Sequence, residues 1–86
     1  MEVIYKYPLQ IMSGIQTVEL PDKSKLLSAQ MQGSSLCLWA RVNPKFAKIN
    51  RHFRVIGTGQ EFNSVGLEYV ATIQDAPFVW HLFEVL

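Results

Sequence analysis

Positive charge is concentrated in one stretch of the sequence, between Arg41 and Arg54. Five of the eight lysine and arginine residues lie in this stretch, and no acidic residue separates them. Arginine presents a planar fork of N–H donors that matches a phosphate or carboxylate group. The stretch therefore predicts an anion site that includes Arg41 and Arg54. The alternative is a solvated connection whose cations face water.

A glycine-rich triplet, Gly57, Thr58 and Gly59, follows the basic stretch directly. Glycine lets the backbone approach a ligand closely or adopt a positive φ, and successive N–H groups can hold an anion. The Thr58 hydroxyl would add one more hydrogen bond. The triplet lacks the third glycine of a dinucleotide-binding loop and the GK[ST] ending of a Walker loop. It predicts either a phosphate contact or a plain turn or bulge without a ligand.

Aromatic residues surround a histidine near the end of the sequence. Trp80 and His81 lie in an apolar segment with Phe78 and Phe83, and Trp39 lies in a second apolar segment. An exposed aromatic ring that stacks a nucleobase contributes about 1–3 kcal/mol per base. We therefore expect Trp39 or Trp80 to stack a base and His81 to donate a hydrogen bond. In the alternative, both tryptophans and His81 are hydrogen-bonded core residues.

Residues for catalysis or metal binding are sparse. The sequence has two histidines and one cysteine, without the HxH, CxxC or HExxH spacings of metal sites. Its serines lack a nucleophile-elbow context, and its acidic residues are scattered. We therefore expect a protein that is not an enzyme and that uses no metal or other cofactor. A small nucleotide hydrolase with His81 as general base is the minor alternative.

Short β-strands must position these groups. Runs of β-branched and aromatic residues, bounded by proline, glycine and aspartate turns, predict strands at 3–7, 15–20, 25–32, 35–42, 51–56, 67–74 and 78–85. Gly33-Ser34 is the clearest hairpin signal. This spacing predicts a mainly β fold, a small antiparallel β-sandwich or barrel of about six to seven strands. At most one short helical turn is expected, after Asn43-Pro44, an N-cap residue followed by proline at the first helical position.

Alternation assigns two faces to two of these strands. In 35–42 the even-numbered apolar residues share one side, and Cys37, Trp39 and Arg41 share the other. In 78–85 Trp80 lies on one side and His81 on the other. Because both faces are apolar or aromatic, these strands should be internal to a sheet, or face a core on one side and a partner or ligand on the other. Cys37 is expected to be a buried, inert thiol.

Length and composition bound the remaining choices. The 86 residues predict a single β domain, residues 1–86, and the net charge of +1 argues against nucleic-acid binding or attachment to a membrane surface. No secretory signal and no apolar run near the ~20 residues of a spanning helix are present, so we expect a cytoplasmic protein. The apolar fraction of 49% favours a homo-oligomer, a dimer or larger, over a well-filled monomer.

Three segments carry a resemblance to a known family. They follow one another in the order Cys37 to Ala40, Phe53 to Gly59 and Phe78 to Glu84. With this pattern the chain resembles, over nearly its whole length, a family of short uncharacterised proteins of phages and of bacteria that carry prophages. The resemblance implies a phage context, with the cytoplasm of the bacterial host as the location. It implies no established activity.

These features together predict a non-catalytic binding protein that captures a small phosphate-bearing ligand. Arg41, Arg54 and the triplet 57–59 would hold the phosphates. By analogy with other small phage proteins, the ligand would be a nucleotide or a cyclic-nucleotide-like immune signal, and its capture would counteract host defence. The alternative is a protein–protein adaptor or inhibitor of a host or phage protein, since such interfaces are rich in the same residue types.

Overall fold

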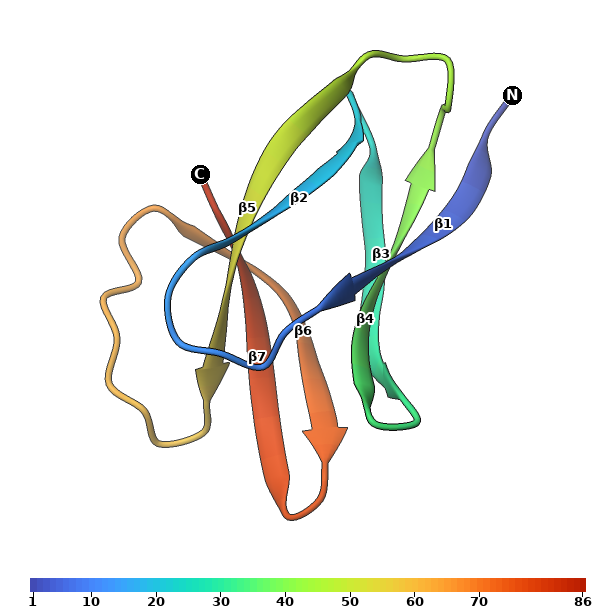
Figure 1. The fold of residues 1–86 in the computed structure, drawn as a ribbon. Coiled ribbons are helices and arrows are strands. Elements are labelled where there is room, and N and C mark those ends of the chain that lie inside the picture. Colours follow the sequence, from blue (N-terminus) through green and yellow to red (C-terminus); the bar gives the residue numbers. More distant parts are fainter.

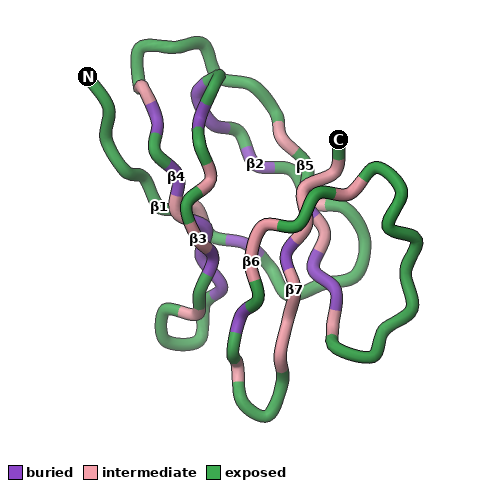
Figure 2. The backbone as a smooth tube through the Cα atoms, turned by 180° about the vertical axis from the view of Figure 1, so that it is seen from behind, coloured by how far each residue is buried: buried purple, intermediate pink, exposed green.

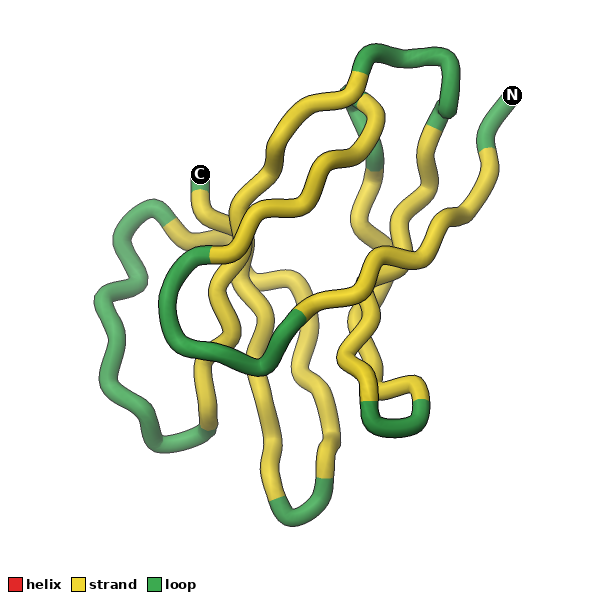
Figure 3. The backbone as a smooth tube through the Cα atoms, in the orientation of Figure 1, coloured by secondary structure: helices red, strands yellow, loops and turns green.

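The computed structural model, which describes residues 1–86, contains seven β-strands and no helix (Figures 1 and 3). The strands are β1 (Val3–Leu9), β2 (Gln16–Pro21), β3 (Lys25–Gln32), β4 (Ser35–Val42), β5 (Lys48–Gly57), β6 (Leu67–Asp75) and β7 (Phe78–Val85). They form sheet A, in the order β1-β4-β3, and sheet B, in the order β2-β5-β7-β6, and all pairings are antiparallel. The predicted small antiparallel β-sandwich is confirmed. The chain forms no helix with the length and apolar character needed to span a membrane.

The predicted limits of three strands, β3, β4 and β7, agree with the structure. β1 is longer than expected because it continues through Pro8, which pairs with Cys37 of β4. β1 is an edge strand with a neighbour on one side only. An edge strand tolerates proline where the nitrogen faces away from the neighbour, because no ladder hydrogen bond is lost there.

No helix forms after Asn43, within the prediction of at most one short helical turn. Asn43 does act like an N-cap, since its side-chain oxygen accepts the N–H of Lys45 at 3.0 Å. The chain then makes a single turn, in which the N–H of Phe46 donates to the Asn43 carbonyl, and β5 begins at Lys48. Lys48 and Ile49 pair with β2. This pairing prevails because a helix of one or two turns has too few hydrogen bonds to offset the cost of its nucleation.

The core lies between the sheets and is built from alternate residues of each strand. In β4 the even-numbered residues 36–42 are buried in it, as the alternation predicts. Phe53, Val55 and Leu82 face them from sheet B. β4 and β7 each lie between two other strands, so the prediction of internal strands is confirmed. Figure 2 shows that β1, in contrast, is exposed along most of its length.

The outer face of sheet B carries two of the predicted site residues, Arg54 and His81. The register places Ile56 opposite His81 and Arg54 opposite Phe83, on the face that points away from the core. Ile56 is nevertheless only 1% exposed. The segment between β5 and β6, residues 58–66, packs on this face through Phe62, which contacts Phe83, and its first residues line a hollow there.

Candidate functional site

The hollow on the outer face of sheet B gathers four of the predicted site residues, and we call it the loop pocket. It measures about 300 Å³, at the lower end of the range of small-molecule sites. Its lining consists of Ile56, Gly57, Thr58, Gly59, Gln60, Phe62, His81 and Phe83. Gly57, Thr58, Gly59 and His81 are thereby brought together, although more than twenty residues separate the triplet from the histidine.

The glycine triplet forms a tight turn. The N–H of Gln60 donates to the Gly57 carbonyl at 3.0 Å, and Gly59 has φ +87°, which glycine adopts readily at the third position of a type II turn. The N–H of Gly57 donates to the side-chain oxygen of Gln60 at 3.0 Å, and that of Thr58 donates to the Val79 carbonyl at 3.2 Å. Within the triplet, the structure therefore leaves only the N–H of Gly59 for a ligand.

His81 lies at the centre of a hydrogen-bonded row on the outer face. The Thr58 hydroxyl donates to the Val79 carbonyl at 3.2 Å, so it accepts the Nε2–H of His81 at 2.8 Å. In the neutral ring Nδ1 then accepts the Thr72 hydroxyl at 3.0 Å, and Thr72 accepts the Tyr69 hydroxyl at 2.7 Å. This assignment follows from the network, because ring hydrogens are placed by their partners. Both ring nitrogens are therefore hydrogen-bonded to threonine hydroxyls, which fix the ring on the outer face of the sheet.

Aromatic rings form the other wall of the loop pocket. Phe62, from the loop, packs on Phe83 of β7 with ring centroids 5.3 Å apart, and Tyr69 meets Phe83 edge-on at 5.8 Å. Sequence reasoning missed Phe62 and Phe83 as site residues. The alternation in β7 placed Phe83 beside His81, but no local signal indicates that Phe62 folds back onto the sheet.

Arg54 adjoins the loop pocket and has no acidic partner. It lies opposite Phe83 and two residues before Ile56, on the outer face of β5. The only ion pairs in the structure join Arg41 to Glu2 and Arg51 to Glu84. The guanidinium of Arg54 is therefore the one arginine charge of this protein that no carboxylate neutralises.

Trp80 belongs to the opposite face of the same sheet. Its ring packs against the core, stacks on Phe78 with centroids 5.5 Å apart, and donates its Nε1–H to Asp75 at 3.0 Å. A Cβ added at Gly57 would lie 3.2 Å from this ring, so glycine makes room for it. Trp80 lines a neighbouring hollow of about 420 Å³, which shares only Gly57 and Thr58 with the loop pocket.

Trp39 and Arg41 lie on the outer face of sheet A, away from the loop pocket. Trp39 is half-buried between Lys6 and Ser28 of the neighbouring strands. Arg41 forms an exposed ion pair with Glu2 at 3.5 Å. The eight predicted residues therefore do not form one site. Four line the loop pocket, Arg54 adjoins it, Trp80 lies behind it, and two belong to the other sheet.

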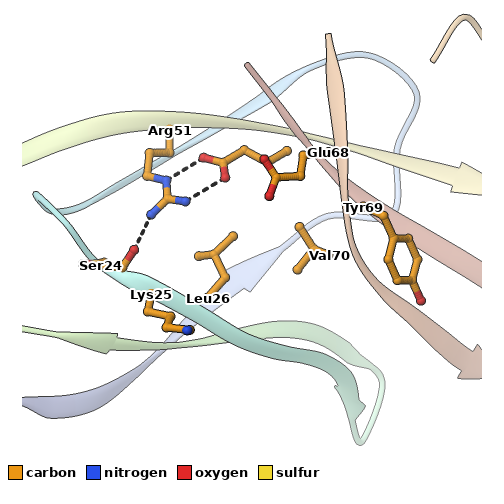
Figure 4. Close-up of a pocket in the computed structure, with 8 residues that line it drawn as sticks. Ser24, Lys25, Leu26, Arg51, Glu68, Tyr69 and Val70 are labelled. Atoms are coloured by element: carbon orange, nitrogen blue, oxygen red, sulfur yellow. Dashed lines mark hydrogen bonds and ion pairs between the residues drawn. The ribbon is translucent and has the colours of Figure 1, made fainter. Parts of the chain in front are cut away.

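Arg51 explains why the basic stretch is not one anion site. Its side chain lies on the inner face of sheet B. There its guanidinium donates two hydrogen bonds to Glu84, of 2.5 and 2.7 Å, and one to the Ser24 carbonyl, of 2.6 Å (Figure 4). The hydrogen bond to Glu84 raises the pKa of Arg51 above its ordinary value, and burial opposes this effect. The hollow beside this pair, about 360 Å³, also presents Glu68. Arg51 therefore ties β5 and β7 to the start of β3 and is not available to a ligand.

Comparisons with known proteins give one family and no relative of known structure. No curated protein and no solved structure matches the chain. A family described as "Domain of unknown function (DUF7352)" matches residues 1–86, which is the full chain. This protein therefore belongs to the family Domain of unknown function (DUF7352).

Proposed function

We propose that this protein binds a small ligand with a planar ring and an anionic group, such as a nucleotide, in the loop pocket, without transforming it. The observation that carries the proposal is the position of Arg54, an arginine without a carboxylate partner beside a pocket with aromatic walls. A charged group of this kind next to an apolar hollow suits a ligand that has both parts.

The contacts of the proposed complex follow from the lining. The ring of the ligand packs against Phe62 and Phe83, whose stacking is tolerant of the identity of the base. The anionic group accepts hydrogen bonds from Arg54 and from the N–H of Gly59, two donors that the protein leaves free. His81 keeps Thr58 in place and does not contact the ligand through a free nitrogen.

The resemblance to phage proteins narrows the proposed ligand further. In a phage context, a small binding protein that withdraws a signalling nucleotide from the host would weaken a defence response. We therefore propose a nucleotide or cyclic-nucleotide immune signal as the ligand class. The loop pocket supports the ring and the anionic group of such a ligand, and the context supports the signalling role.

Calorimetric titration with AMP, GMP and a cyclic dinucleotide tests this function. We expect one of them to bind and Arg54→Ala to weaken it roughly ten- to hundred-fold, since hydrogen bonds to a charged group contribute about 1.5–3 kcal/mol. Lys45→Ala, which removes an exposed cation from the 43–47 turn, is the matched control and should leave the affinity unchanged. Equal affinity of wild type and Arg54→Ala would remove Arg54 from the site.

Native mass spectrometry of protein purified gently from phage-infected cells extends this test to ligands outside the panel. We expect a discrete added mass of several hundred daltons, released on denaturation. If the protein carries no such mass and no probe binds, the ligand proposal is wrong. Product accumulating from a bound nucleotide would contradict the non-catalytic part of the proposal.

A second candidate function is that of an interaction protein. Large apolar side chains are exposed at both ends of the chain and in the loops, among them Ile4, Val65 and Leu86. Surface of this kind is typical of proteins that another polypeptide covers. A stoichiometric complex with a purified host or phage protein, unaffected by Arg54→Ala, would favour this function over ligand capture.

A further inference from the structure

β1 is the least protected of the four edge strands. The edges of sheet A are β1 and β3, and those of sheet B are β2 and β6. β3 and β6 each carry a β-bulge, which disturbs the edge and hinders pairing with another chain. β2 has six residues and ends in Pro21. β1 pairs with β4 over seven consecutive residues without a bulge, so its other side presents a regular row of backbone groups, in which only Pro8, near the end of the strand, lacks an N–H donor.

The side chains of β1 add apolar surface to this open edge. Val3, Ile4 and Tyr5 are 42%, 61% and 45% exposed. Ile4 projects from the outer face of sheet A, whereas Val3 and Tyr5 project from the inner face, opposite Val42 and Ala40. Val42 and Ala40 are fully buried, but their neighbours on β1 are not. This part of the strand is therefore apolar on both faces and uncovered on both.

We propose that a second copy of this chain pairs with β1 in an antiparallel arrangement around a two-fold axis at Ile4. Pro8 has no N–H, so it costs no hydrogen bond to β4 if its nitrogen points to the open side of the strand. Backbone groups alternate in direction along a strand, so those of Ile4 and Lys6 also point away from β4. In the proposed register Ile4 meets Ile4 of the second copy, and Lys6 meets its Glu2. The two sheets A thus become one six-stranded sheet.

The charges of Glu2 and Lys6 favour this register over the two registers whose axis lies at Tyr5 or Lys6. With the axis at Ile4, two pairs of opposite charge, Glu2 with Lys6, flank an apolar centre on the outer face, and Val3 packs beside Tyr5 on the inner face. Within its own chain Glu2 pairs with Arg41 through one carboxylate oxygen and Lys6 donates one N–H to Gln32, so each group retains hydrogen-bonding capacity for the second copy. An axis at Lys6 would set two lysines against each other and pair Ile4 with Pro8. An axis at Tyr5 would pair Ile4 with Lys6 and Glu2 with Pro8, which lacks a donor. Opposite charges across strands stabilise pairing, and like charges oppose it.

Sedimentation velocity of the full chain tests the pairing. The monomer has a mass of 9.8 kDa, and we expect wild type at about 100 μM to sediment as a species of twice that mass, since a dimer with Kd near 1 μM is almost fully formed there. Ile4→Lys places two lysines at the axis and should yield a monomer with unchanged circular dichroism. Val65→Lys, at an equally apolar but remote position that is 85% exposed, is the control and should remain dimeric.

Charge reversal tests the register itself. Glu2→Lys alone or Lys6→Glu alone sets like charges opposite each other twice per dimer, so each should raise the dissociation constant about ten-fold or more. The double variant Glu2→Lys/Lys6→Glu restores opposite charges and should regain most of the affinity. A monomeric wild type at the same concentration would overturn the proposal, and so would a dimer that survives Ile4→Lys. A dimer without rescue in the double variant would overturn the register.

Discussion

At the scale of single residues, two arginines of β5, Arg51 and Arg54, lie on opposite faces of sheet B, because successive side chains of a strand alternate between its faces. Arg51 points inward to Glu84 and Ser24, and Arg54 points outward beside the loop pocket. Arg51 and Glu84 are mostly buried, with side chains 20% and 12% exposed. Loss of one partner of such a pair leaves the other charged and unpaired away from water.

We therefore expect Arg51→Met to lower the free energy of unfolding by about 2–4 kcal/mol, measured by urea denaturation. Arg41→Met removes an exposed ion pair, with Glu2, and is the matched control. It should cost about 0–1 kcal/mol, because water screens pairs at the surface. Equal effects of the two substitutions would show that the buried geometry of Arg51 contributes nothing special to stability.

At the scale of the elements, the turn 57–60 connects the core to the loop pocket. Gly57 leaves space for the Trp80 ring on the inner face, and Gly59 supplies the positive φ that closes the turn. The side chain of Gln60 fastens this turn through the N–H of Gly57. The triplet 57–59, which resembles an anion-binding loop in sequence, thus mainly forms a turn. This turn places Thr58 and Gly59 in the lining of the loop pocket.

Gly59→Ala should lower the free energy of unfolding by about 1–2 kcal/mol, because an L-residue is strained at φ +87°. Gly59→Asn should cost less, since asparagine tolerates a positive φ better than alanine does. Thermal unfolding followed by circular dichroism gives both values. If alanine were as stable as glycine at this position, the turn in solution would differ from the one described.

At the scale of the whole molecule, two sheets share one core. Sheet A has one internal strand, β4, and sheet B has two, β5 and β7, each hydrogen-bonded on both sides. We expect the amides of β4 and β7 to exchange with deuterium more slowly than those of β2 and β6, which are edges. Hydrogen exchange followed by nuclear magnetic resonance measures this order directly. Faster exchange in β7 than in β6 would contradict the observed strand order.

The sequence by itself determined much of the local structure. Alternating apolar residues and turn residues are local features, and they identified seven strands, the hairpin at Gly33 and the inner face of β4. They misplaced the start of β5, because the pairing of Lys48 and Ile49 with β2 outweighs the local helical signal of Asn43-Pro44. Pairing between strands distant in the chain leaves no mark in a local window.

Only the tertiary structure decided which chemical groups meet. The sequence analysis assigned Trp39 and Arg41 to the same site as His81, but strand order assigns them to the other sheet. The separation of Trp80 from His81, in contrast, already followed from the alternation within β7. Phe62 joins His81 because a loop folds back over the sheet. The physical reason is that alternation fixes a side chain's face within its own strand, whereas sheet order and loop path arise from packing of the entire chain.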